Sequence, residues 1–478
     1  MAQEFDVIVI GGGPAGISGA NTAGLFGKRV ALAEKLREVG GAGINTGTLP
    51  SKTLRETALA LSGVRSRKLF GVDLSLRREA TVADFMRHMT NVAAQNRRRR
   101  EEQMRIFNVE TFHGAATFVD PHTVRVGPDK QLRGEKILIA TGSSPVRPAE
   151  FPFEHLRVHD SDEILEIGML PKTLAVVGAG VVGAEYACTF AALGVEVHLI
   201  DGRDSLLGFL DREISQNIER AMTAGGVRFV WKEKVTRCDA PAAGDLTLTL
   251  TSGATLAGTD VLVAAGRKSN TDDLNLAAAG LTPGKRGLVK VDAQCRTEVP
   301  HIFAAGDVIG APALAATGME QARMAMCVAC EVNFKDVVAP ILPTGIYTIP
   351  EASMAGETED SLKSKGVDYV VGRARYTDNP RGQIVGDQSG LLKLIFARDD
   401  MRLLGVHVVG EQATELVHIG LVAMMSGSGA QLFNRTCFNY PTLGDLYKYA
   451  TYEAILKRDG LVANEESKAR SDIPVAIA

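Results

Sequence analysis

Two glycine-rich segments carry the most specific chemical signal in the sequence. A β-branched run over residues 6–10 leads directly into Gly11, Gly13, Pro14, Ala15 and Gly16. A second run over residues 173–177 leads in the same way into Gly178, Gly180, Val181, Val182 and Gly183. After a strand, such a turn brings backbone N–H groups and a helix N-terminus against a pyrophosphate. Each segment therefore predicts a dinucleotide site.

An acidic residue follows each glycine turn at the distance that this chemistry requires. Glu34 and Asp201 each end the next predicted strand, about 20 residues after the first glycine, where a carboxylate accepts hydrogen bonds from ribose hydroxyls. One glycine motif alone is weak evidence. Two copies, each between a strand and a helix and each with its acid in register, predict two dinucleotide-binding units.

The elements that position these residues are two βαβ units and the strands that join them. Buried strands over residues 136–140 and 261–264 run into Thr141–Gly142 and Gly266–Arg267, and we expect them to close the two sheets and carry the chain between domains. A further strand over residues 301–305 ends at Asp307. That acid is either a ligand for the polyol of a flavin dinucleotide or an ordinary loop acid or helix cap.

Two features predict three domains: the chain length, and the change after residue 343 to strands mixed with helices that carry no glycine motif. A chain of 478 residues is long enough for about three. We expect an α/β protein with two Rossmann-like dinucleotide-binding domains and a C-terminal α+β interface domain. Their expected boundaries are 1–149 with 271–342 for FAD, 150–270 for NAD(P), and 343–478 for dimerisation, with a polar tail from about 457.

Composition and charge exclude several other classes of protein. The 53 basic and 56 acidic side chains leave a net charge of −3, so no global positive field favours nucleic acid. The apolar stretch over residues 174–193 contains Glu185 and several glycines, which argues against a membrane span. The acidic start of the chain predicts no signal peptide, and six scattered cysteines favour the cytoplasm.

Residues 40–52, GGAGINTGTLPSK, resemble the redox helix of the flavoprotein disulfide reductases, and the resemblance covers nearly the whole chain. In that family two cysteines face the flavin, and here Gly43 and Thr48 occupy their positions. The family's C-terminal His and Glu correspond to Tyr440 and Asp445. The sequence is therefore most similar to the soluble (Si-specific) pyridine nucleotide transhydrogenases, the branch that needs no thiol relay, although that branch usually keeps the first cysteine.

The resemblance implies an oxidoreductase that binds FAD in the first site and NAD(H) or NADP(H) in the second. Hydride would pass from NADPH to FAD and then to NAD⁺ in a ping-pong cycle, in a homodimer. It assigns Lys52 and Glu185 to an ion pair beside the flavin, and leaves Thr48 either facing the flavin or filling volume. Its other expected cofactor contacts are Lys35, Gly41, Lys52, Gly114, Ala115, Thr141, Gly142, Val235, Gly266, Arg267 and Ala315.

Nucleotide preference stays open at this point. Asp201 favours an unphosphorylated adenosine ribose, whereas Arg203 either pairs with a 2′-phosphate or is an exposed turn residue. Preference for NADH and balanced use of both nucleotides are both compatible with that pair.

Two other functions fit the same motifs. The first is an NAD(P)H oxidase or a quinone or dye reductase (diaphorase), and the second is an NADH-binding flavoprotein redox sensor.

We interpret Cys327 and Cys330 as buried small side chains, and residues 97–100 (RRRR) as a solvated helix face. No metal site is expected.

Overall fold

The computed structural model describes residues 2–61 and 82–461, which divide into two compact units. The first unit comprises residues 2–61, 82–204 and 226–340, and the second comprises residues 205–225 and 341–461. Residues 205–225 thus group with the C-terminal part of the chain. The expected polar tail lies outside the described residues beyond position 461.

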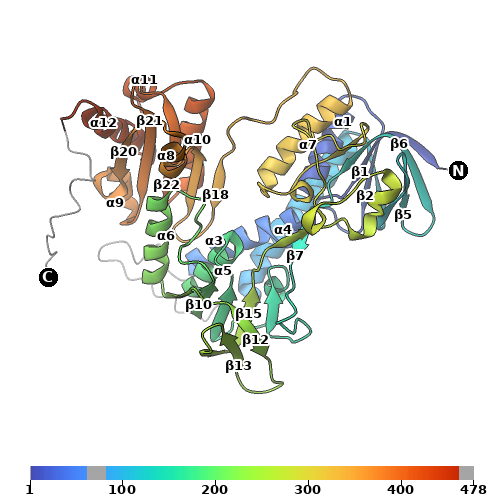
Figure 1. The fold of residues 1–478 in the computed structure, drawn as a ribbon, viewed down its shortest axis with the longest axis horizontal. Helices are drawn as coiled ribbons and strands as arrows, with labels where there is room; N and C mark the ends of the chain where they lie inside the picture. Colours follow the sequence, from blue (N-terminus) through green and yellow to red (C-terminus); the bar gives the residue numbers. More distant parts are fainter. Residues whose placement is uncertain (1, 62–81, 462–478) are drawn as a thin grey trace. The chain divides into compact units, whose positions relative to one another are not determined.

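The first sheet of the first unit carries the first glycine turn (Figure 1). Its path is β3-β2-β1-β6-β5-β4, and β17 pairs with β6. Strands β1, β2, β3, β6 and β17 run parallel, and β4 and β5 extend the sheet as an antiparallel hairpin. The strands are β1 (Gln3–Ile10), β2 (Val30–Glu34), β3 (Val109–His113), β4 (Ala116–Asp120), β5 (Thr123–Val126), β6 (Lys130–Ile139) and β17 (Ile302–Ala304).

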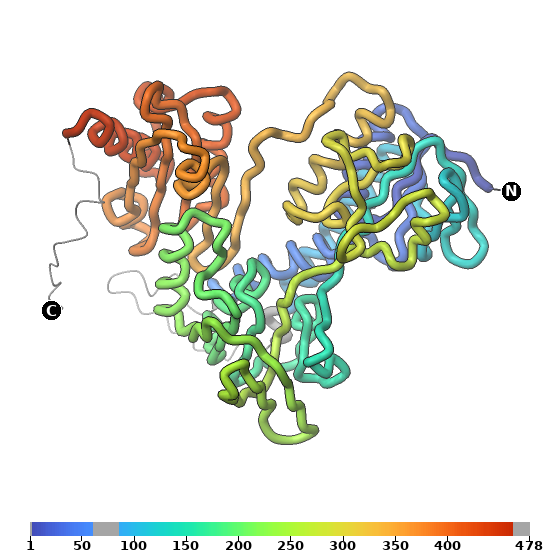
Figure 2. The backbone as a smooth tube through the Cα atoms, in the orientation of Figure 1, coloured from blue at the N-terminus to red at the C-terminus, as the bar shows by residue number. Residues whose placement is uncertain are grey.

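Helices pack on this sheet because β1 and β2 are buried on both faces, as parallel strands require. Figure 2 shows the chain returning late in the sequence, so that α7 lies beside α1. The helices of this part are α1 (Pro14–Leu25), α2 (Gly41–Asn45), α3 (Thr48–Leu61), α4 (Val82–Ile106) and α7 (Ala315–Ala329).

The second sheet of the same unit is fully parallel and carries the second glycine turn. Its order is β11-β10-β9-β15-β8, with α5 (Val181–Ala192) following β9. Antiparallel β12, β13 and β14 form a small separate sheet, and β7 pairs with β16 where the chain crosses between the two halves. The strands are β7 (Ser143–Pro145), β8 (Val158–Asp160), β9 (Thr173–Val177), β10 (Glu196–Asp201), β11 (Val227–Trp231), β12 (Val235–Asp239), β13 (Leu246–Leu250), β14 (Thr255–Gly258), β15 (Asp260–Val263) and β16 (Arg267–Ser269).

The expectation that the strands over residues 136–140 and 261–264 close their sheets is wrong. Residues 137–139 of β6 lie between β1 and β17, and β15 lies between β9 and β8. Each is therefore an inner strand whose C-terminal end lies next to a glycine turn. A sequence pattern reports that a strand is buried but does not fix its neighbours, which explains the error.

The second unit is built on one antiparallel sheet in the order β18-β19-β22-β21-β20. Its core joins the sheet to α10 and α12 around Tyr376, Phe396 and Tyr447. The strands are β18 (Thr344–Ile346), β19 (Ala352–Gly356), β20 (Tyr369–Arg375), β21 (Leu391–Ala397) and β22 (Leu403–Val409). The helices are α6 (Arg212–Ala224), α8 (Glu359–Lys365), α9 (Pro380–Val385), α10 (Ala413–Met425), α11 (Ala430–Arg435) and α12 (Leu446–Arg458).

Short 3₁₀ turns connect several of these elements in both units. They are η2 (Glu163–Glu166), η3 (Asp272–Leu274), η4 (Leu276–Ala279), η5 (Lys285–Gly287), η6 (Asp307–Ile309), η7 (Tyr376–Asp378) and η8 (Leu443–Asp445).

Candidate functional site

The first glycine turn, residues 11–16, forms a concave backbone surface that we call the first cradle. Side chains at Gly11 or Gly16 would fill it. Gly11 has φ +105°, and a Cβ there would collide with the carbonyl of Ala140 at the end of β6. A Cβ on Gly16 would overlap the carbonyl oxygen of Gly11, so α1 approaches the end of β1 only because residue 16 is glycine. In the part of the chain that the structure describes, no side chain caps the first turn of α1. Its free N–H groups and dipole are suited to a pyrophosphate.

The acid of the first unit is held by backbone donors at the end of β2. Buried Glu34 accepts through Oε2 from the N–H of Gly12 at 2.7 Å and through Oε1 from the N–H of Leu36 at 2.9 Å. A carboxylate offers about four acceptor positions, so about two remain for the hydroxyls of a ribose. Gly41 lies against the same turn, where an added Cβ would be 2.9 Å from the Cα of Gly13.

A polar network orients Asp307 at the C-terminal end of β17. The hydroxyl of Ser143 donates to Asp307 Oδ2 at 2.7 Å, and Arg267 donates from Nε to the Ser143 hydroxyl at 2.8 Å. Arg267 also donates from Nη2 to the Ser143 carbonyl at 2.7 Å. Among residues 2–61 and 82–461, the buried hydroxyl of Thr141 has no hydrogen-bond partner. A buried orphan hydroxyl beside a glycine cradle indicates a missing polar ligand, and these residues fit the flavin dinucleotide expected here.

The second glycine turn repeats this geometry in the second sheet. Gly178 has φ +106°, and a Cβ there would lie 2.5 Å from the Ala264 carbonyl oxygen at the end of β15. A Cβ on Gly183 would overlap the carbonyl oxygen of Gly178. Asp201 Oδ2 accepts from the N–H of Ala179 at 2.7 Å. The residues therefore fit a second dinucleotide, as the repeat in the sequence predicts.

The two halves of the first unit meet at the predicted ion pair. Lys52 on α3 and Glu185 on α5 are 133 positions apart in sequence, yet Lys52 Nζ lies 2.5 Å from Glu185 Oε2. Only 8% of the Glu185 side chain is exposed, against 25% for Lys52. Helix α5 begins directly after the second glycine turn, and α3 follows the segment at residues 40–47. The pair therefore links the helix that follows the second glycine turn to the helix that follows residues 40–47, and Gly41 in that segment lies against the first glycine turn.

The thiol positions of the related reductases carry no redox pair here. Pro14 fills the space beside Gly43, because a Cβ on Gly43 would collide with the Pro14 ring. Thr48 is exposed at the start of α3. All six cysteines are free thiols, and burial raises the pKa of both Cys327 and Cys330. In the second unit, Tyr440 is exposed and Asp445 ends η8.

The remaining predicted contacts all lie within the first unit. Gly114, Gly142 and Gly266 have positive φ, and the N–H of Gly114 donates to the carbonyl of Glu34 at 2.8 Å. Ala315 begins α7, Val235 begins β12, and Lys35 is exposed after β2. Ala115 lies between β3 and β4.

Sequence reasoning missed three residues that position the site. Ser143 and Gln321 hold the Asp307 turn, because Gln321 Oε1 accepts from the N–H of Gly306 at 3.0 Å. Arg97 pairs with Glu38 at 2.9 Å and donates to Asn45 Oδ1 at 3.1 Å. For Arg97 the solvated-face interpretation is wrong. No sequence signal pointed to this contact, because Arg97 and Asn45 are 52 positions apart.

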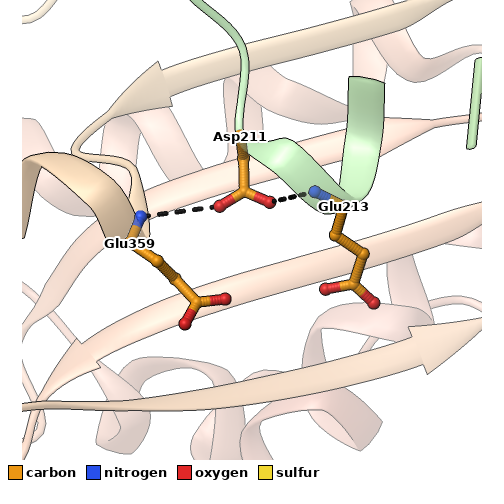
Figure 3. Close-up of side chains that lie close together, drawn as sticks. All are labelled: Asp211, Glu213 and Glu359. Atoms are coloured by element: carbon orange, nitrogen blue, oxygen red, sulfur yellow. Dashed lines mark hydrogen bonds between the residues drawn. The ribbon is translucent and has the colours of Figure 1, made fainter. Parts of the chain in front are cut away.

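A separate acidic cluster in the second unit is paired with two cations of the same unit, Lys393 and Arg373. Figure 3 shows Asp211, Glu213 and Glu359 together, with the backbone N–H groups of Glu213 and Glu359 donating to Asp211. The ammonium of Lys393 lies 2.7 Å from Asp211, 3.1 Å from Glu213 and 2.5 Å from Glu359. Burial would lower the pKa of Lys393, but these carboxylates raise it. This cluster is a structural contact between α6, α8 and β21.

Comparison with known proteins agrees with this geometry. The pyridine nucleotide-disulphide oxidoreductase model matches residues 5–325, and the dimerisation domain of the same family matches residues 342–451. In the described residues, no helix has the length and apolar character needed to cross a bilayer.

Several curated relatives are named soluble pyridine nucleotide transhydrogenase. One from Mycobacterium tuberculosis is 42% identical over 96% of this chain and 99% of its own. One from Azotobacter vinelandii is 40% identical over 95% of this chain and 98% of its own. One from Colwellia psychrerythraea is 38% identical over 95% of this chain and 98% of its own.

Solved structures of similar fold include flavoproteins. The HOCl-induced flavoprotein disulfide reductase RclA from Escherichia coli has a TM-score of 0.85 and 26% identity, covering 94% of this chain and 99% of its own. LpdA from Mycobacterium tuberculosis is similar in fold, with a TM-score of 0.86 and 24% identity. The match covers 94% of this chain and 99% of its own. With both dinucleotide cradles in place and matches over nearly the full length, this chain belongs to the pyridine nucleotide-disulphide oxidoreductase family.

Proposed function

We propose that this protein is a soluble pyridine nucleotide transhydrogenase, which moves hydride between NADPH and NAD⁺ through bound FAD. The observation that carries the proposal is the Lys52–Glu185 ion pair, which joins two dinucleotide cradles where no dithiol is available. The relatives named as transhydrogenases support the same reaction. FAD, when bound, supplies the centre that accepts hydride from one nicotinamide and returns it to another.

The chain's own residues bind and orient the two dinucleotides. In this proposal, Glu34 binds the adenosine ribose of FAD and Asp307 binds its polyol. The ammonium of Lys52 stabilises negative charge beside the flavin, and Glu185 keeps that ammonium in position. Asp201 and Arg203 bind the adenosine end of the nicotinamide nucleotide. No residue has to act as a general acid, which agrees with Tyr440 in place of the relay histidine.

The assembly and location follow from the same proposal. We take the protein to be a homodimer joined through residues 343–478, with FAD bound by 1–149 and 271–342 and NAD(P) by 150–270. Exposed apolar side chains on α10 and α12, including Val422, Met425 and Tyr449, support a dimer surface in the second unit. Six free thiols support a cytoplasmic location.

Stopped-flow absorbance of the FAD-loaded protein tests this function. Under anaerobic conditions NADPH should bleach the flavin absorbance rapidly, and NAD⁺ should then restore it rapidly. Fast recovery with oxygen or a quinone, but not with NAD⁺, would instead indicate an oxidase or a diaphorase. A bleached complex that persists in the presence of every acceptor would indicate a redox sensor.

A further inference from the structure

The segment over residues 38–47 connects the first cradle to the helix that carries Lys52. It contains four glycines, at positions 40, 41, 43 and 47. Glycine loses more conformational freedom on folding than any other residue, so a segment this rich in glycine needs contacts that hold it. Helix α3 starts directly after the segment, and Lys52 lies in the second turn of that helix. The position of the Lys52 ammonium therefore depends on how firmly the segment is fixed.

A disulfide cannot hold this segment, because residues 38–52 contain no cysteine. The related reductases carry their two cysteines at the positions of Gly43 and Thr48, where a disulfide would tie α2 to α3. Here Gly43 packs against Pro14 instead, and an added Cβ would lie 2.4 Å from Pro14 Cγ. The order of the segment must therefore come from noncovalent contacts.

One set of these contacts comes from the first cradle. The N–H of Gly40 donates to the carbonyl of Gly12 at 2.7 Å, and Pro14 at the start of α1 covers Gly43. The side chain of Ile44 is buried. These contacts hold residues 40–44, and they leave the end of α2 to be held from elsewhere.

Arg97 on α4 supplies the contact at that end. Its Nη1 donates to Asn45 Oδ1 at 3.1 Å and lies 2.9 Å from Glu38 Oε2. One nitrogen thus bridges Glu38, which precedes α2, and Asn45, which is the last residue of α2. The amide of Asn45 is itself oriented, because its Nδ2 donates to the carbonyl of Val39 at 3.4 Å.

The two halves of this bridge differ in strength. Only 21% of the Arg97 side chain is exposed, against 56% for Glu38. An exposed ion pair contributes little to stability, whereas a hydrogen bond from a charged donor contributes more. The contact of Arg97 with Asn45 should therefore carry most of the effect.

The neighbouring arginines of the same run are placed differently. Arg98 and Arg99 are exposed, and Arg100 donates to Gln103 Oε1 at 3.0 Å on the same helix. Successive residues of an α-helix project about 100° apart, which explains why adjacent arginines differ so much. Arg98 thus offers a matched control with the same chemistry, one position along the chain.

We propose that Arg97 is a positioning residue for flavin reduction, which fixes residues 38–47 by polar contacts where the related reductases have a disulfide. The inference rests on the proposed function, since it concerns hydride transfer to the bound flavin. Arg97 acts through Asn45 and the start of α3, and so holds Lys52 in place relative to the first cradle. It needs no contact of its own with FAD.

Loss of this contact should loosen the segment in the FAD-loaded, full-length protein. In Arg97→Met, amide hydrogen exchange over residues 40–52 should be about 10- to 100-fold faster, because a hydrogen bond from a charged donor is lost. The limiting rate of flavin bleaching by NADPH should fall about 10-fold, because Lys52 is less well placed. The NADPH concentration that gives half of that rate should not change, since the second cradle is untouched.

Two further variants identify the contact itself. Asn45→Ala removes the acceptor and should reproduce the effects of Arg97→Met. The double variant should be no worse than either single one, because both remove the same interaction. Arg97→Lys keeps the positive charge but not the shape of the guanidinium, and should lie between the wild type and Arg97→Met. Arg98→Met should exchange and bleach as the wild type does.

The outcomes separate this inference from the proposed function. Faster exchange over residues 40–52 and slower bleaching in both Arg97→Met and Asn45→Ala, with an unaffected Arg98→Met, support the positioning role. Unchanged exchange in Arg97→Met, additive effects in the double variant, or an equal effect of Arg98→Met overturns it. If this pattern holds but the wild type passes no hydride from NADPH to NAD⁺, the transhydrogenase proposal fails and the role of Arg97 stands.

Discussion

Removing the ammonium of Lys52 should destabilise the protein and slow the reduction of bound flavin by NADPH. Neutralising Glu185 should lower the free energy of unfolding by a smaller amount. At 2.5 Å and an effective dielectric constant of about 20, the Coulomb attraction of the pair is about 6–7 kcal/mol before desolvation. Lys52→Met leaves a carboxylate that is only 8% exposed without that ammonium. We expect a loss of about 2–4 kcal/mol in the free energy of unfolding. In Glu185→Gln the remaining lysine is better solvated, and the loss should be about 1 kcal/mol.

The kinetic effect of Lys52→Met follows from the same geometry. A positioned charge beside developing negative charge typically contributes about 10²–10³ in rate. Flavin bleaching by NADPH, followed by stopped-flow absorbance, should therefore slow about 10²-fold in Lys52→Met. Urea unfolding of the FAD-loaded single and double variants gives the coupling energy of the pair.

Arg29→Met is the matched control for stability. Arg29 and Glu110 form an ion pair at 3.2 Å in the same unit, with 54% and 45% of their side chains exposed. Its loss should cost under about 1 kcal/mol. The reasoning is refuted if Lys52→Met is no more destabilising than Arg29→Met while flavin bleaching keeps its normal rate.

Three further predictions concern the fold and the two cradles. Lys393→Met removes the buried one of the two cations that pair with Asp211, Glu213 and Glu359, and should cost about 3–5 kcal/mol in urea unfolding. Exposed Lys365→Met should cost under about 1 kcal/mol, and equal losses would contradict this reasoning. Burial lowers the pKa of His407 below 6.5, so the unfolded chain binds a proton that the folded chain excludes. The free energy of unfolding should thus fall as pH drops below about 6.5, by at most about 1.4 kcal/mol per pH unit, and His407→Gln should flatten that slope; an unchanged slope counts against it. Gly16→Ala should abolish FAD binding, seen as loss of the yellow colour. Gly183→Ala should retain FAD and lose binding of the nicotinamide nucleotide. Loss of the same ligand in both variants would be inconsistent with two separate cradles.

Local sequence patterns predicted the parts of this protein that depend on neighbours in the chain. A strand, a glycine turn and a helix follow one another within about 20 residues. The glycine turns at Gly11 and Gly178 and the acids Glu34 and Asp201 could therefore be predicted directly. The absence of a cysteine pair at positions 43 and 48 was equally visible.

Tertiary structure decided which distant residues touch. The neighbours of β6 and β15, the Ser143–Arg267 support of Asp307 and the contact of Arg97 with Asn45 join segments whose spacing in sequence carries no period. The folding of Arg203 onto Asp201 is the clearest case. The sequence alone identifies both residues at one strand end, but only the side-chain geometry reveals that the arginine fills the acid's acceptor positions. The physical reason is that hydrogen bonding depends on direction and distance in space, which residue order does not specify.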